Sequence, residues 1–216
     1  MRAGRVVASV ASGLALAVAL ANGAPVGASD SSTAKKLVIT KADAGRGFVA
    51  EPAPDEVDTF TEIAQCVGKP SPGRTTVAHA AGPLLVDERN AVTITSTVDI
   101  VKTAKAAKAD QAIVEDLHFP DCFAEVLDRA SGYGTLVDSQ RVKLGRYGDY
   151  STALLSRVES SRAGESAGAS VVTVLVRQGR AELLTQFATE GTTPVPKASV
   201  EKILDKVAKR LDAADV

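Results

Sequence analysis

The chain has 216 residues, of which 45% are hydrophobic, 24% are charged and 4% are aromatic, and its formal net charge is -1. These proportions exclude a collagen-like, low-complexity or wholly disordered chain. The near-neutral charge provides no basic field for nucleic acid, so we expect no nucleic-acid partner.

Residues 1–28 have the features of a secretory signal peptide. Two arginines precede an apolar run over residues 6–21, and a small-x-small pattern ends at Ala28, which places the cleavage site before Ser29. A charged start, a short apolar run and a small-residue site are typical of exported proteins. The alternative is a membrane anchor, but the run is shorter than the roughly 20 residues that span a bilayer. We therefore predict a secreted protein with no stable membrane span after cleavage.

The rest of the chain is expected to form one domain. Residues 29–36 are small and polar, which predicts a flexible leader. Residues 37–213 are long enough to enclose a core and contain no internal repeat, so they are predicted to be a single secreted domain. A lipid anchor would need a cysteine at the cleavage site, and none is present there, so we do not expect a lipoprotein.

The two cysteines, Cys66 and Cys122, both follow the predicted signal peptide. In an exported chain such a pair most simply forms one disulfide. The alternative is a redox-active or metal-binding thiol pair, but the chain has no Cys-x-x-Cys motif. In the chain-entropy model a crosslink that closes so long a loop is worth about 4 kcal/mol.

The first predicted elements are short. Residues 41–48 read as one helical turn ended by glycine, and residues 49–57 contain two prolines and are predicted to be loop. A short helix is predicted over residues 58–67, with Cys66 in its last turn. Its apolar residues share one face: Phe60, Ile63, Ala64 and Val67.

The middle of the chain predicts strands followed by two helices. An extended segment is expected near residues 77–86, and residues 90–101 form the clearest strand, because aliphatic side chains alternate there with threonines and Asp99. A helix is predicted over residues 103–117. Pro120 is suited to the start of the next helix, which carries Cys122.

The last part of the chain predicts four strands and a helix. The strands are expected over residues 135–144, 149–159, 169–178 and 180–189, with a tight turn at Gly179 and a longer mobile loop over residues 160–168. The last two strands are apolar on both faces, so both faces must be covered. An amphipathic helix ends near Ala213. We therefore predict an α+β fold: a mainly antiparallel β-sheet with helices packed on it.

No catalytic residue, metal site or cofactor is predicted. The segment Gly164-Glu-Ser166-Ala-Gly168 has the letters of a hydrolase motif, but it lies between two predicted strands instead of at a strand-to-helix turn. His79 and His118 stand apart, and no metal-ligand spacing or phosphate-binding glycine loop is present. Three tyrosines near glycines are weak candidates for lining a ligand cleft, with packing at loop edges as the alternative: Tyr133, Tyr147 and Tyr150.

The order of these elements resembles a known group of proteins. The matching segments are "ITKADAGRGF", "FTEIAQCVG", "AVTITSTVDIV" and "FPDCFAEVL", together with the strand block and the last helix. They resemble secreted actinobacterial proteins related to the extracellular sensor domain of PknH-type kinases, and small exported lipoproteins with a PsbP-like sandwich. The resemblance covers residues 37–211 and implies an α/β sandwich with a cleft. The chain departs from the kinase sensors in having one cysteine pair instead of two disulfides, and it has no kinase domain or lipidation cysteine.

We therefore expect a secreted, non-enzymatic binding or sensor-like module for a small or lipidic ligand or for a cell-envelope protein. One alternative is a protein-interaction or inhibitor protein that acts through the loop at residues 160–168. Another is an unusual secreted hydrolase that uses Ser166 and a histidine. An apolar pocket of about 300 Å³ or more, with a few convergent polar groups, would favour a ligand carrier.

Overall fold

The computed structural model describes residues 28–54, 59–69, 75–131, 135–162, 165–214 and 216. The strands are β1 (Val49–Glu51), β2 (Thr76–Ala81), β3 (Leu84–Asp87), β4 (Val92–Val101), β5 (Thr135–Val142), β6 (Tyr150–Arg162), β7 (Glu165–Gln178) and β8 (Ala181–Glu190). The helices are α2 (Ala28–Leu37), α3 (Lys41–Ala44), α4 (Phe60–Cys66), α5 (Ala104–Val114), α6 (Phe119–Ser131) and α7 (Lys197–Asp212).

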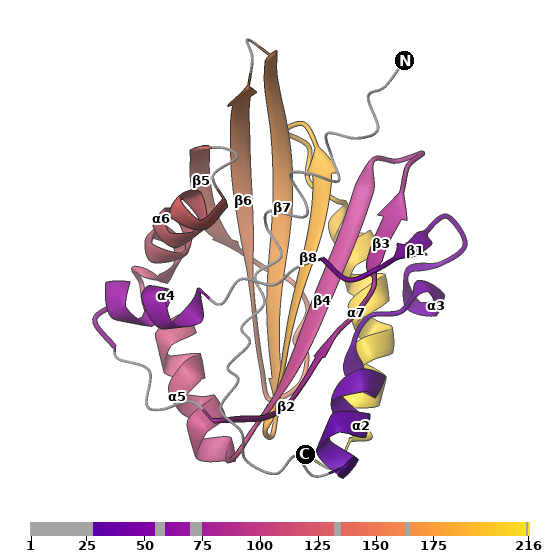
Figure 1. Ribbon diagram of the computed structural model, residues 1–216, viewed down its shortest axis with the longest axis vertical. Coiled ribbons are helices and arrows are strands. Elements are labelled where there is room, and N and C mark those ends of the chain that lie inside the picture. The colour runs from indigo at the N-terminus through magenta and orange to yellow at the C-terminus, as the bar shows by residue number, and fades with distance from the viewer. Residues whose placement is uncertain (1–27, 55–58, 70–74, 132–134, 163–164, 215) are drawn as a thin grey trace.

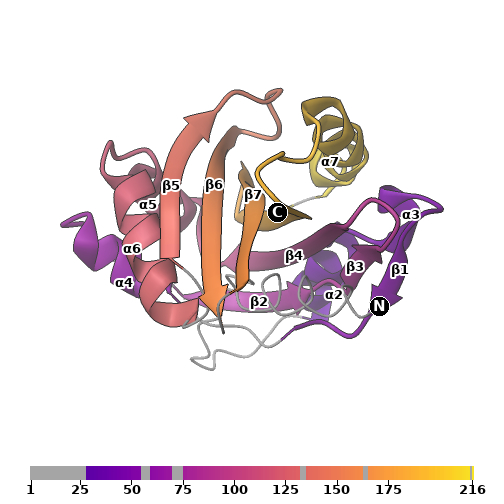
Figure 2. The same cartoon turned by 90° about the horizontal axis from the view of Figure 1, so that it is seen from above.

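The strands form one eight-stranded antiparallel sheet in the order β1-β3-β4-β8-β7-β6-β5 (Figure 1). The edge of β4 that does not pair with β8 has two partners. Strand β3 pairs with its first part and β2 pairs with its second part. In Figure 2, α4, α5 and α6 gather on one side of the strands and α7 lies on the other. The predicted α+β fold, a mainly antiparallel sheet with helices packed on it, is confirmed.

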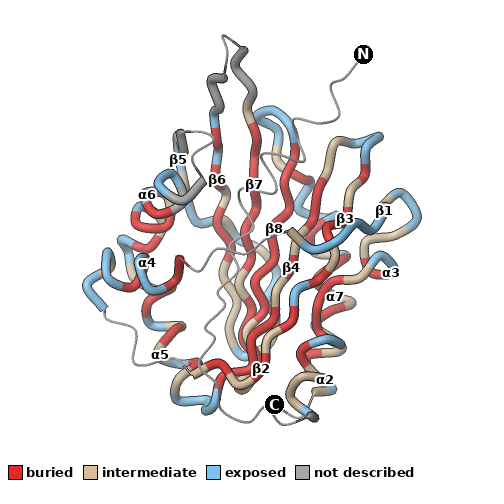
Figure 3. Tube along the Cα trace, viewed as in Figure 1, coloured by how far each residue is buried: buried red, intermediate tan, exposed pale blue. Residues whose placement is uncertain are grey.

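Each face of the sheet has its own core, because successive side chains of a strand point to opposite faces. Ile94, Val98 and Ile100 of β4 belong to the core that the sheet shares with α2 and α7. Leu154 of β6 and Val171 of β7 belong to the core that it shares with α4, α5 and α6. Figure 3 shows buried residues running along the central strands. The sequence-based expectation that both faces are covered is therefore confirmed.

The predicted loop over residues 160–168 is wrong for residues 160–162 and 165–168, and residues 163 and 164 lie outside the described residues. Strands β6 and β7 stay paired through this region, with Ser160 opposite Ala167 and Arg162 opposite Glu165. The segment is rich in serine, glycine and alanine, which is typical of loops. Backbone ladder hydrogen bonds nevertheless continue the register that the apolar parts of the two strands set. Figure 1 shows the resulting hairpin reaching beyond the other strands.

A second difference concerns β1, which lies where a loop was predicted over residues 49–57. Its three residues pair with Leu84, Leu85 and Val86 of β3 and are all exposed. A short exposed strand at a sheet edge needs no apolar pattern, because its backbone hydrogen bonds alone hold it. Alternation therefore could not reveal it.

The predicted flexible leader over residues 29–36 is also wrong, because these residues belong to α2. Ala34 and Leu37 are fully buried in the core shared with α7. Asp30 accepts hydrogen bonds from both terminal nitrogens of Arg180, at 2.9 and 3.4 Å. Two apolar residues one turn apart were too weak a pattern to predict this helix. Tertiary packing supplies the stabilisation that its sequence lacks.

We expect Arg180→Ala to weaken the attachment of α2. The guanidinium of Arg180 also donates to the carbonyl of Val101, at 3.2 Å, so the substitution removes a half-buried ion pair and a hydrogen bond. The expected loss in the free energy of unfolding is about 1 kcal/mol. Urea denaturation would measure it, and amide hydrogen exchange should quicken in α2 before it quickens in β4. Equal protection of α2 in the variant and the parent protein would contradict this role for Asp30.

The other helices begin and end close to their predicted bounds. The side chain of Thr103 caps α5 by accepting a hydrogen bond from the backbone of Ala106, at 3.1 Å. Helix α7 starts at Lys197, directly after Pro196. Among the described residues, no helix is both long and apolar enough to cross a membrane.

Candidate functional site

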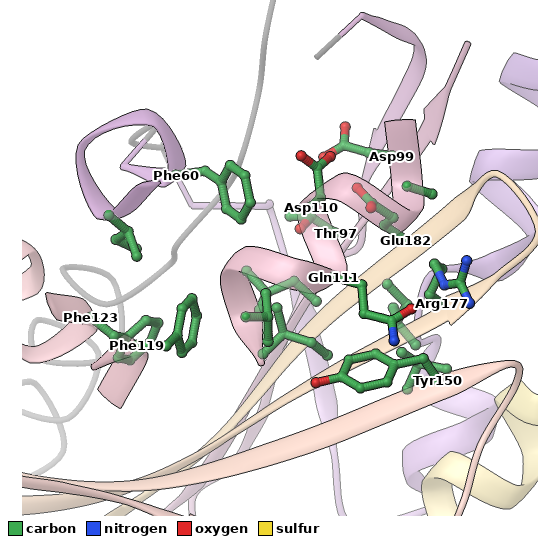
Figure 4. Close-up of a pocket in the computed structure, with 17 residues that line it drawn as sticks. Phe60, Thr97, Asp99, Asp110, Gln111, Phe119, Phe123, Tyr150, Arg177 and Glu182 are labelled. Carbon is green, nitrogen blue, oxygen red and sulfur yellow. The ribbon is translucent and has the colours of Figure 1, made fainter. Parts of the chain in front are cut away.

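The first hollow lies between the sheet and the helices α4, α5 and α6, and its volume is about 60 Å³ (Figure 4). One side is aromatic and aliphatic, with Phe60, Phe119 and Phe123 among its lining residues. In Figure 4 the labelled acids Asp99 and Asp110 lie together, away from Phe119 and Phe123. We call this space the α5 hollow.

A row of polar side chains crosses the sheet at the floor of the α5 hollow. Direct register pairs link His79 of β2 to Asp99 of β4, Asp99 to Glu182 of β8, Glu182 to Arg177 of β7, and Arg177 to Tyr150 of β6. Directly paired residues of antiparallel strands point to the same face. These five residues, which we call the polar row, therefore share the face covered by α5.

Several charged groups of this region are buried. Asp99 is 4% exposed, Arg177 is 8% exposed and Asp110 of α5 is 3% exposed. The ring Nδ1 of His79 lies 2.9 Å from a carboxylate oxygen of Asp99, and a terminal nitrogen of Arg177 lies 4.0 Å from a carboxylate oxygen of Asp149. Burying a charged group costs free energy unless the group is well paired. The packing of the hydrophobic core therefore gives no reason for charged residues in the polar row. A hollow of about 60 Å³ nevertheless admits only a small group, far below the ligand-binding range.

The structure describes two of the three candidate tyrosines and places them apart. Tyr150 lines the α5 hollow, where burial and then the charge of Glu115 raise the pKa of its phenol. Tyr147 is buried in the core on the opposite face, beside α7. Tyr133 lies outside the described residues. Tyr147 and Tyr150 therefore lie on opposite faces of the sheet, each beside a different hollow, and a ligand-binding role for either stays a prediction.

A second and much larger hollow, of about 660 Å³, lies beside α7 on the opposite face. We call it the α7 groove. Its apolar lining is formed by Phe48, Val92, Ile94, Phe187, Pro194, Val195 and Ile203. Its polar lining includes Asp43, Asp87, Asn90, Glu190, Thr193, Ser199, Lys202 and Lys206. This volume lies within the roughly 300–1,000 Å³ of small-molecule sites, and the lining combines apolar side chains with polar and charged ones.

The walls of the α7 groove are fixed by hydrogen bonds. Asp87 is 7% exposed and accepts from the backbone of Arg89 and Asn90 and from the Asn90 side chain, which holds the turn between β3 and β4. On the opposite wall, Lys206 donates to the carbonyl oxygens of Ala42 and Asp43. Helix α7 is thus joined to α3 at one wall of the groove.

A third hollow, of about 380 Å³, lies on the other flank of α7 and is lined by Tyr147, residues 141–145 and residues 151–153, together with Val174. Burial, with the nearby carboxylates of Asp205 and Glu201, raises the pKa of Tyr147 to about 12. Glu201 also accepts a hydrogen bond from the backbone of Gly145, at 2.8 Å. Glu201 therefore contacts a residue that lines this hollow, whereas Lys202 and Lys206 line the α7 groove.

The predicted disulfide is present in the structure, where it joins Cys66 at the end of α4 to Cys122 in the first turn of α6. Cys66 is exposed and Cys122 is buried. Both helices contribute aromatic side chains to the α5 hollow. The disulfide therefore holds one wall of that hollow against the other.

The sequence around Ser166 that matches the Gly-x-Ser-x-Gly motif does not form a strand-to-helix turn. Ser166 instead belongs to β7 and pairs in register with Ser161. His79 contacts Asp99, whereas the ring of His118 contacts Asp116 at 3.2 Å, on the segment between α5 and α6. Hydrogen bonds from Lys69 and the His118 backbone hold the pKa of Asp116 well below its usual range. Within the described ranges, no group of three or more His, Cys, Asp or Glu residues is arranged to hold a metal ion.

Sequence reasoning missed the α7 groove. Its lining comes from α3, β3, β4, β8 and α7, which are far apart in the chain, so no local pattern unites them. One signal was available: Lys202 and Lys206 follow each other at helical spacing on one flank of α7. The polar row was equally hidden, because only the register of β2, β4, β8, β7 and β6 brings its residues together.

No family model and no curated protein matches this sequence. Among solved structures, the chain is similar to the extracellular domain of PknH from Mycobacterium tuberculosis, with 12% identity and a TM-score of 0.45 over 89% of this chain and 100% of that chain. It is also similar to LpqN of Mycobacterium tuberculosis, described as involved in cell envelope biogenesis, with 12% identity and a TM-score of 0.29 over 63% of this chain and 76% of that chain. A third similarity is to PA94 of Pseudomonas aeruginosa, a protein of unknown function, with 18% identity and a TM-score of 0.23 over 45% and 58% of the two chains. The predicted resemblance to PknH-type extracellular domains is therefore confirmed.

Proposed function

We propose that the protein is an exported, non-enzymatic binding module that holds an elongated apolar ligand in the α7 groove. The observation that carries this proposal is the volume of about 660 Å³ combined with an apolar lining from both the sheet and α7. Burial of apolar surface drives such binding at about 25 cal/mol per Å². Export is supported by the signal-like features of residues 1–28.

The α7 groove supports this function better than the α5 hollow does. The α5 hollow has more buried charge, but its volume of about 60 Å³ leaves no room for a chain of carbon atoms. The α7 groove is also bounded by elements that are hydrogen-bonded to one another, so a ligand would not have to order its walls. Preorganised walls reduce the cost of binding.

The proposal is tested with the methyl ester of cis-parinaric acid, a neutral fluorescent long-chain probe. We expect saturable binding by the parent protein. Ser199→Trp places a large ring at an exposed position that lines the α7 groove, and it should weaken binding by about tenfold or more. Ala198→Trp is the matched control, because Ala198 is the exposed neighbour that does not line the groove.

Two results would contradict the proposal. One is the absence of saturable binding by a folded parent protein. The other is equal binding by both tryptophan variants, since that would place the probe elsewhere on the molecule. Circular dichroism of each variant shows whether the fold is kept.

A further inference from the structure

We infer that the α7 groove selects an amphiphile with a single anionic head, a long-chain carboxylate, and that Lys202 is the residue that receives the carboxylate. This inference rests on the proposed function, because it assigns a ligand class to the same site. Two observations support it. One is how the charged residues are distributed on α7, and the other is which charged side chains of the groove already have hydrogen-bond or ion-pair partners.

Two acids and two lysines of α7 lie on different flanks of the helix, and Lys197 pairs with Glu201 on the acidic flank. Glu201 and Asp205 lie on the flank that faces Tyr147. Lys202 and Lys206 line the α7 groove, four residues apart. Like charges at this spacing repel each other and destabilise a helix by a few tenths of a kcal/mol, so helix stability does not explain the pair.

The two lysines differ in whether their ammonium groups already have hydrogen-bond partners. Lys206 donates to the carbonyl oxygens of Ala42 and Asp43, which fixes its ammonium group on α3. Lys202 is exposed, and among the described residues no hydrogen bond or ion pair engages it. Lys202 is therefore the lysine of the groove whose charge is available to a ligand.

Most of the groove's acidic groups are already engaged. Asp43 is paired with Arg210 at 2.6 Å, and Asp87 accepts the hydrogen bonds of its turn. Glu190 is exposed at the rim and opposes an anion there. We place the carboxylate at Lys202, with the hydrocarbon chain along the apolar lining formed by Ile203, Phe187 and Val92.

The test compares cis-parinaric acid with its methyl ester, two probes that differ in the charge of the head. We expect the acid to bind the parent protein roughly fivefold more tightly than the ester at low salt, as an exposed ion pair allows. Lys202→Ala should abolish this preference, because it should weaken binding of the acid and leave binding of the ester unchanged. Lys209→Ala is the matched control, an exposed lysine on α7 that lines neither of the two hollows beside it.

Two further measurements sharpen the test. The preference for the acid should fall as sodium chloride is added, since salt screens exposed charges. Glu190→Gln should raise the affinity for the acid and not for the ester. Equal affinities of the parent protein for the two probes, or a preference that survives Lys202→Ala, would overturn the inference while the proposed function stands. Failure of both probes to bind would instead overturn the proposed function.

Discussion

Removing the disulfide by Cys66→Ala together with Cys122→Ala is expected to lower the free energy of unfolding by about 4 kcal/mol. The crosslink joins positions separated by 56 residues, so it strongly restricts the unfolded chain. It also holds α4, which has seven residues and is too short to persist as an isolated helix. Phe60 and Ile63 of α4 are buried only while the helix is in place.

Urea denaturation of the oxidised protein, the reduced protein and the double alanine variant would measure this effect. The reduced protein and the variant should agree, since both lose the same crosslink. A loss below about 1 kcal/mol would show that the ion pair between Lys69 and Asp116, at 2.7 Å, and the packing of α4 suffice without the disulfide.

Replacing Arg210 by methionine is expected to lower the free energy of unfolding by about 3 kcal/mol. The guanidinium of Arg210 binds both carboxylate oxygens of Asp43, at 2.6 and 2.9 Å, and donates to the carbonyl of Val38 at 3.0 Å. Asp43 is 5% exposed, so the substitution leaves a buried charge without its main partner. Lys209→Met is the matched control, because Lys209 is the exposed neighbour on the same helix.

The same pair predicts how stability depends on pH. Burial raises the pKa of Asp43, but hydrogen bonds from Arg210 and Thr40 outweigh burial and bring the pKa below its ordinary value of 3.8. A carboxyl whose pKa is lower in the folded state stabilises the protein above its unfolded pKa, and this contribution is lost as the pH falls through the folded pKa. Asp43→Asn should therefore reduce the loss of stability below about pH 4. An unchanged acid transition in this variant would contradict the assignment.

Strongly periodic segments of the sequence predicted the fold well. The alternation of β4 and the apolar stripe of α7 fixed where these elements lie and which side of each is buried. The predictions failed where tertiary contacts, instead of pattern, form the structure. Helix α2 depends on Leu37 and on the distant Arg180, and the paired hairpin at residues 160–168 depends on backbone bonds between serine- and glycine-rich strands.

The candidate site was less accessible to sequence reasoning than the fold. The two cysteines were found because their chemistry limits them to few roles. The α7 groove depends on the distance between α7 and the turn at Asp87, and no sequence pattern contains that distance. Tyr147 and Tyr150 were grouped together because they are close in the chain, although the register of the strands places their side chains on opposite faces of the sheet.

The most direct test of ligand binding in the α7 groove is a methyl NMR titration of the whole protein with the methyl ester of cis-parinaric acid. We expect saturable shifts of the methyl signals of Val92, Val195 and Ile203, which line the groove. The methyl signals of Val114 and Leu184, which line the α5 hollow on the opposite face, should stay in place. Shifts confined to Val114 and Leu184, or no saturable shift at any of these residues, would contradict the account.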